Sequence, residues 1–114
     1  MTFQEQERNG VMVIQLGGAL DLLTARDFRL MWERLQERDC HRIVLDLAGV
    51  DFIDSQSLAI IISQAIHCRK LGGDVKVAAV QPQILRVFEL VRMKDVLDFH
   101  DDPELAVQSF SPSA

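Results

Sequence analysis

Residues 43–58 read IVLDLAGVDFIDSQSL, and they hold the clearest structural pattern in the chain. Ile43 to Leu47 are almost continuously apolar, which is typical of a central strand covered on both faces. Gly49 to Asp54 predict a loop. Asp54 or Ser55 can then begin a helix, because a side-chain oxygen there accepts hydrogen bonds from free backbone N–H groups. The residues that follow repeat apolar side chains at helical spacing, at Leu58, Ile61, Ile62 and Ala65. A buried strand followed by a loop and a helix indicates an α/β fold.

The N-terminal side of this segment predicts a β-hairpin and a helix. Asn9-Gly10 is a hairpin signal because both residues tolerate positive φ, and it joins Phe3–Glu7 to the β-rich run Val11–Leu16. Gly17-Gly18 is expected to end the second strand. Leu22 to Arg38 then predict an amphipathic helix. Its apolar stripe comprises Phe28, Met31, Trp32 and Leu35.

The C-terminal side continues the alternation of helices and strands. Gly72-Gly73 is expected to end the helix that follows the loop. Val75–Val80 predicts a strand, and Pro82 suits the first turn of a further helix, where no N–H is required. The buried stripe of that helix is predicted at Ile84, Val87, Phe88 and Val91. A short strand at Val96–Phe99 and a last helix ending near Phe110 complete the order.

These elements predict one α/β domain over residues 1–110, followed by a tail, 111–114, that is expected to fray. A chain of 114 residues has room for a single domain. Single crossover helices between buried strands favour right-handed connections. The sequence therefore predicts an α/β sandwich with a β-hairpin at its start.

The composition favours an ordinary globular protein over several other classes. With 48% hydrophobic and 25% charged residues, the chain can bury a normal core. Its net charge of −5 argues against general nucleic-acid binding, which needs clustered Lys and Arg. No apolar run is long enough to span a membrane, so no direct membrane insertion is expected, and we expect a cytoplasmic protein. Cys40 and Cys68 lie in no metal or disulfide pattern, and reduced, partly buried thiols are expected.

Reactive side chains do not converge in the sequence as an enzyme would need. The three histidines, His41, His67 and His100, are spread through the chain, and no paired metal-ligand spacing or glycine-rich phosphate loop occurs. A catalytic triad built from Ser55, Asp54 and one histidine is conceivable, but Ser55 lacks the G-x-S-x-G setting of a hydrolase. No enzyme activity, cofactor or metal site is therefore predicted.

Four aspartates invite comparison with the acidic pocket of a two-component receiver domain. They are Asp21, Asp46, Asp51 and Asp54. A receiver has adjacent acids just after its first strand and a lysine after its last. Here glycines follow the early strand, and Lys94 precedes a weak one. We therefore interpret the four aspartates as solvated loop and cap residues.

Taken with its neighbours, the segment from Leu45 to Leu58 resembles the signature of the STAS domain, the module named after sulfate transporters and anti-sigma factor antagonists. Leu16 to Asp21 is similar to the family's early L-x-G-E-L-D turn, and Gly72-Gly73 before a strand is similar to its G-G entry to a late strand. Pro82 to Val91 resembles its helix more loosely. The likeness covers about residues 11 to 108. It implies a STAS-type sandwich, with a mixed sheet of four to five strands and about four helices.

The resemblance also implies a function and the residues that perform it. In free-standing members, a serine after the aspartate of D-S-S-G-L is phosphorylated by an anti-sigma factor that is also a serine kinase, and a PP2C-type phosphatase reverses the change. That serine corresponds to Ser55. The unmodified antagonist binds the kinase, and the sigma factor is affected only indirectly. Partner contacts are expected at Asp21, Asp54, Gln56, Ser57 and Leu58.

The chain departs from the family pattern around this serine. D-S-S-G-L-G is here Asp54-Ser55-Gln56-Ser57-Leu58-Ala59, and Ala19 stands where the early turn has an acid. Ser57 is therefore a second candidate phosphate acceptor. Three other hypotheses remain. Ser55 serves only as a helix cap, the protein is a non-phosphorylated STAS subunit of an ABC lipid-trafficking transport assembly, or it is a hydrolase with Ser55 as nucleophile.

Overall fold

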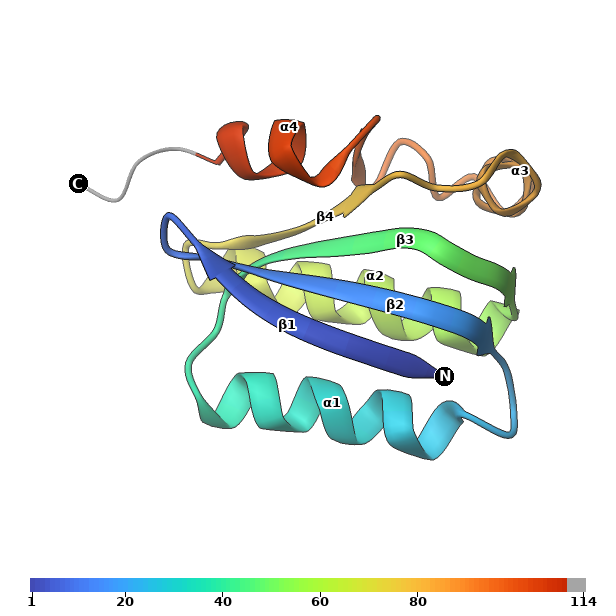
Figure 1. Cartoon of the computed structure of the whole chain (residues 1–114), viewed down its shortest axis with the longest axis horizontal. Coiled ribbons are helices and arrows are strands. Elements are labelled where there is room, and N and C mark those ends of the chain that lie inside the picture. Colours follow the sequence, from blue (N-terminus) through green and yellow to red (C-terminus); the bar gives the residue numbers. More distant parts are fainter. Residues whose placement is uncertain (111–114) are drawn as a thin grey trace.

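A single five-stranded sheet organises the protein, whose computed structural model describes residues 1–110 (Figure 1). The expected fraying of residues 111–114 lies outside the described part. The strands run in the order β1-β2-β3-β4-β5. Their bounds are β1 Thr2–Arg8, β2 Val11–Leu20, β3 Arg42–Ile53, β4 Asp74–Ala78 and β5 Asp98–His100. The predicted hairpin is present: β1 and β2 are antiparallel, and Asn9 and Gly10 both have positive φ. The other neighbouring pairs are parallel, so the sheet is mixed, as expected.

Four helices accompany the sheet within residues 1–110. They are α1 Ala25–Glu37, α2 Ser55–Lys70, α3 Pro82–Leu90 and α4 Pro103–Gln108. Figure 1 shows α1 and α2 on one side of the sheet and α4 on the opposite side. The fold class predicted from the sequence is confirmed.

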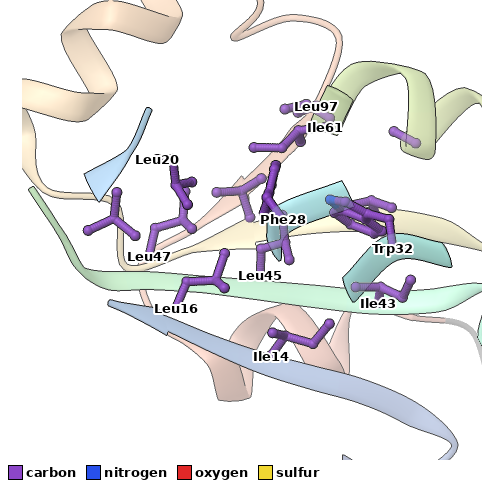
Figure 2. Packing of buried hydrophobic residues seen from close by; sticks show 14 of the residues in the cluster. Ile14, Leu16, Leu20, Phe28, Trp32, Ile43, Leu45, Leu47, Ile61 and Leu97 are labelled. Carbon is purple, nitrogen blue, oxygen red and sulfur yellow. The ribbon is translucent and has the colours of Figure 1, made fainter. Parts of the chain in front are cut away.

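The main core lies between the sheet and the two helices α1 and α2. Phe28 and Trp32 of α1 meet edge to face, with ring centroids 5.9 Å apart, over Ile43 and Leu45 of β3 (Figure 2). The buried residues of α3, Ile84 and Phe88, belong to the same cluster. A smaller cluster fills the space under α4. It comprises Val11, Val13, Val44, Ala78, Ala106 and Val107.

Two strands run further than the sequence predicted. The prediction that Gly17-Gly18 ends a strand is wrong, as is the prediction that Gly49 to Asp54 is a loop. Gly17 pairs with Gly49 and Leu20 pairs with Ile53, so β2 and β3 stay together through both segments. Glycine permits this pairing, because a Cβ at Gly49 would lie 3.0 Å from the Leu16 carbonyl oxygen.

Smaller differences concern the ends of elements. Helix α1 begins at Ala25 rather than Leu22, because a turn at Asp21 comes before it. Strand β4 ends at Ala78, and Ala79 takes positive φ. In α3 Val91 is exposed rather than buried, because it lies past the last helical turn. In residues 1–110, no helix combines the length and apolarity that crossing a membrane requires.

Candidate functional site

The N-terminus of α2 is fixed to the end of β2. Asp54 caps the helix in extended conformation, and its Oδ1 accepts a hydrogen bond of 2.8 Å from the Ser57 N–H. The Asp54 N–H donates to the Leu20 carbonyl oxygen at 3.0 Å. The predicted cap is confirmed. Asp54 takes part in both hydrogen bonds. It therefore joins the first turn of α2 to the end of β2.

Ser55 is the first residue of α2, and its side chain is exposed. Within residues 1–110 its hydroxyl makes no hydrogen bond. The backbone N–H groups of a first helical turn have no partner inside the helix, and Asp54 occupies only that of Ser57. A group attached to Ser55 Oγ would therefore meet free N–H donors and the positive end of the helix dipole.

Ser57 and Leu58 lie in the interior, contrary to the expectation that they contact a partner. Ser57 is 2% exposed, and its hydroxyl donates to the Leu20 carbonyl oxygen at 3.3 Å. Leu58 is fully buried in the main core. The reason is the helical period: Asp54 faces the end of β2, so the residues one turn later point inward. Gln56 stays on the surface beside Ser55.

The turn after β2 places Asp21 beside this helix start. Asp21 Oδ1 accepts hydrogen bonds from the N–H groups of Leu23, at 2.9 Å, and Thr24, at 3.2 Å. The Thr24 hydroxyl donates to the Ala19 carbonyl oxygen at 3.0 Å. Asp21 is therefore committed in part to its own turn, which leaves its second carboxylate oxygen for other contacts.

Three exposed apolar side chains lie in the two segments that adjoin the start of α2, which are the turn after β2 and the end of β3. Leu22 is 79% exposed and Leu23 is 90% exposed. Leu22 had been placed in the helix, although neither leucine fits the spacing of Phe28 and Met31, and that mismatch was the available signal. Phe52 is 51% exposed and pairs with Ala19, close to the same turn. We call Leu22, Leu23 and Phe52, together with Ser55 and Gln56, the α2 N-terminal surface.

The three histidines considered for a catalytic triad all lie far from Ser55. His67 lies about 18 Å along α2 from Ser55. His100 is in register with Ala78, which pairs with Asp46, about 23 Å before Ile53 along β3. His41 precedes the start of β3, at the opposite end of the sheet. The hypothesis of a triad at Ser55 is therefore wrong.

The four aspartates of the receiver comparison have different surroundings. Asp21 and Asp54 form the turn and the cap described above, and Asp51 is exposed on β3. Asp46 departs from the expectation of a solvated loop residue, because it lies within β3 and is 8% exposed. No cluster of three or more His, Cys, Asp or Glu side chains suited to a metal ion occurs in residues 1–110.

Comparison with known proteins finds a matching family model and similar curated sequences. The family model described as "STAS domain" matches residues 2–106. An anti-sigma F factor antagonist of Paenibacillus polymyxa is 28% identical over 103 residues, covering 90% of this chain and 88% of the relative.

Two solved structures have the same fold. An anti-sigma factor antagonist from Mycobacterium paratuberculosis has a TM-score of 0.85 at 22% identity, covering 95% of this chain and 92% of its own. The Bacillus cell fate determinant SpoIIAA in its phosphorylated form has a TM-score of 0.71 at 17% identity, covering 94% and 97%. With a family model that spans nearly the whole chain and a sheet and helices that agree with it, this protein belongs to the STAS domain family.

Proposed function

We propose that this protein is an anti-sigma factor antagonist whose partner is an anti-sigma factor with serine kinase activity. In this proposal the unmodified protein binds the kinase through the α2 N-terminal surface. Phosphorylation of Ser55 releases the kinase, and a PP2C-type phosphatase restores binding. The sigma factor is affected only indirectly. The observation that carries the proposal is that Ser55 is an exposed hydroxyl at a helix N-terminus, and that the adjoining turn and strand end carry three exposed apolar side chains.

The geometry supports a switch that acts at the interface without refolding the protein. A phosphate on Ser55 would add about −1.5 to −2 charges and three acceptor oxygens. The free N–H groups of the first turn can receive some of these oxygens, so the fold should tolerate the group. On the surface, the same charge would lie where the turn that carries Leu22 and the strand end that carries Phe52 adjoin the start of α2. A partner that buries these side chains would have to desolvate the phosphate, which strongly disfavours binding.

The surface also indicates the character of the partner. Its apolar centre, Leu22, Leu23 and Phe52, is flanked by the carboxylates of Asp21 and Asp54. A complementary partner surface would be apolar at its centre and basic at its edge. The relatives named as anti-sigma factor antagonists give the proposal its biological class.

The test measures phosphate and affinity separately. Mass spectrometry of the protein isolated from its own cells should find a phosphate on Ser55. A titration with the purified anti-sigma kinase should then show that Ser55→Ala binds as tightly as the unmodified protein, whereas Ser55→Asp binds about tenfold more weakly or worse. Ser63→Asp is the matched control, because Ser63 is exposed further along α2 and the substitution adds the same charge.

Two outcomes would contradict the proposal. Equal affinity for Ser55→Ala and Ser55→Asp would exclude a switch at this position. Absence of phosphate under all growth conditions, together with copurification of a transporter ATPase, would instead support the non-phosphorylated subunit of an ABC lipid-trafficking assembly.

A further inference from the structure

The side of the sheet that faces α4 is only partly covered. Parallel strands usually have both faces covered, yet α4 is only six residues long and packs over Val11, Val13, Val44 and Ala78. In Figure 1 it is the red helix above the sheet, opposite α1 and α2. Beyond its reach, β1, β2 and β3 present polar side chains on this face.

Three of these polar side chains form one row across the strands. Gln4 pairs with Gln15 in the antiparallel ladder, and Gln15 pairs with Asp46 in the parallel ladder. Directly paired residues project on the same face of a sheet. The row lies in a hollow of about 430 Å³, which Pro103 at the start of α4 bounds on one side. This volume is in the range of small-molecule sites.

Asp46 is the buried charge of this hollow. It is 8% exposed, and within residues 1–110 its hydrogen bonding is limited to the N–H of Ala48, which donates to Oδ1 at 3.0 Å. A buried carboxylate ordinarily has a cation or several donors, because removing it from water is costly. The Oδ2 atom of Asp46 has neither among the described residues, and it is not one of their fully buried polar atoms, so it is open to the hollow.

The charges around the hollow favour a cationic occupant. Its one basic side chain, Arg8, is paired with Glu104 of α4, and its other acid, Glu5, is paired with Arg38. Asp101 and Asp102 add negative charge beside Pro103. The side-chain amides of Gln4 and Gln15 make no hydrogen bond within residues 1–110, so their oxygens are available as acceptors.

We propose that this hollow binds a small organic cation that carries N–H donors, a guanidinium or a primary ammonium. The cation pairs with Asp46 Oδ2 and donates hydrogen bonds to the side-chain oxygens of Gln15 and Gln4. The site is separate from Ser55, because Asp46 lies about 23 Å before Ile53 along β3 and on the opposite face from the main core. Its failure would therefore leave the proposed switch untouched.

The test is an NMR titration of the whole protein with n-butylguanidinium and n-butylammonium chloride at constant ionic strength. Saturable shifts are expected at the backbone amides of Gln4, Gln15 and Ala48. Asp46→Asn keeps an acceptor for the Ala48 N–H but removes the charge, and it should weaken binding about tenfold or more. Gln15→Met, which removes the acceptor at similar size, should weaken binding severalfold. Glu33→Gln is the matched control, because it removes one exposed carboxylate from α1 and should leave binding unchanged.

Tetramethylammonium distinguishes recognition from simple charge attraction, because it carries the same charge without an N–H donor. Shifts of equal size with tetramethylammonium would overturn the proposal. So would unchanged affinity in Asp46→Asn, or no saturation with either probe by the highest soluble concentration.

Discussion

Ser55 and Ser57 are separated by one residue yet differ completely in their surroundings. Ser55 is exposed, whereas Ser57 is 2% exposed and bonded to the Leu20 carbonyl oxygen. Ser57→Asp should therefore destabilise the protein by about 2–4 kcal/mol, because it buries a charge with no cation beside it. Urea denaturation measures this loss. Ser55→Asp, at the favourable end of the helix dipole, should change the free energy of unfolding by no more than about 0.5 kcal/mol.

A similar loss for both variants would mean that Ser55 is not exposed as described. A negligible loss for Ser57→Asp would mean that the first turn of α2 opens easily, and Ser57 would then return as a phosphate acceptor.

The two cysteines should differ in reactivity for a related reason. Cys68 is buried against the main core, and burial, with a smaller effect from Asp74, raises the pKa of its thiol to about 11. Thiolate is the reacting form, so at pH 8 Cys68 should react with iodoacetamide about a hundredfold more slowly in the folded protein than in urea. Mass spectrometry of the Cys40→Ser variant follows this thiol alone. Equal rates in the folded and unfolded states would contradict the burial of Cys68.

At the scale of single residues, the sequence predicted caps better than it predicted exposure. Asp54 and Ser55 were identifiable because a cap needs only a local pattern, a side-chain oxygen before an apolar periodic run. Ser57 and Leu58 were misplaced because the resemblance implied partner contacts along the whole first turn, whereas the helical spacing had already grouped Leu58 with the apolar stripe. Asp46 was misplaced because one acid within an apolar run gives no sign of its depth.

Among the elements, the β2–β3 pair and the start of β4 depend on glycines where two backbones approach closely. A Cβ at Gly49 would lie 3.0 Å from the Leu16 carbonyl oxygen, and one at Gly73 would lie 1.9 Å from that of His41. We expect Gly49→Ala to cost about 1–3 kcal/mol, and Gly73→Ala to cost more, since backbone must move in both cases. Gly10→Ala is the control for positive φ without crowding, because a Cβ there meets nothing within 4 Å. Denaturation midpoints that reverse the order of Gly49 and Gly73 would contradict the register at one of these positions.

The same glycines explain why strand ends were hard to predict. Gly17, Gly18 and Gly49 have the local signal of a turn, and a turn was inferred from each doublet or loop. Gly17 and Gly49 are instead places where neighbouring strands meet closely, a tertiary requirement that local patterns do not encode. Gly18 takes positive φ at a register shift inside β2 rather than at a strand end. At Asn9-Gly10 and Gly72 the turn reading was correct, since positive φ is needed there.

In the whole molecule, the alternation of strands and helices could be predicted because it follows from the order of the local patterns along the chain. The uneven cover of the sheet could not be predicted, because it depends on how short α4 is. Besides the apolar cluster under α4, a group of charges and one ring lies near the end of that helix. Lys76 is 8% exposed, bonds Asp98 at 2.9 Å, and lies 4.7 Å from the ring centroid of Phe110. His100 Nε2 is also 3.0 Å from Asp98 Oδ2.

The Lys76–Asp98–His100 group is expected to make the free energy of unfolding fall in acid. Burial pushes the pKa of Asp98 upward, but hydrogen bonds and charge from Lys76 and His100 outweigh it, and the pKa is held below its ordinary value. A carboxylate whose pKa is lowered by folding stabilises the protein above its unfolded pKa of about 3.9, and this contribution is lost as pH falls through the lower folded value.

Cys68 affects stability at the alkaline end of the pH range. Its raised pKa favours folding below the ordinary thiol value, and that contribution is lost between about pH 9 and about pH 11.

The free energy of unfolding should therefore fall at both ends of the pH range, and each fall should be removable separately. Urea titrations from pH 3 to pH 11 should show that Asp98→Asn flattens the acid fall and leaves the alkaline one, while Cys68→Ala does the reverse at a cost in core packing. Asp95→Asn is the matched control for Asp98, because Asp95 is exposed and has no ion pair within residues 1–110. If Asp95→Asn flattens the acid fall as much as Asp98→Asn, the effect comes from net charge alone, and the Lys76–Asp98–His100 group does not set the acid stability of this fold.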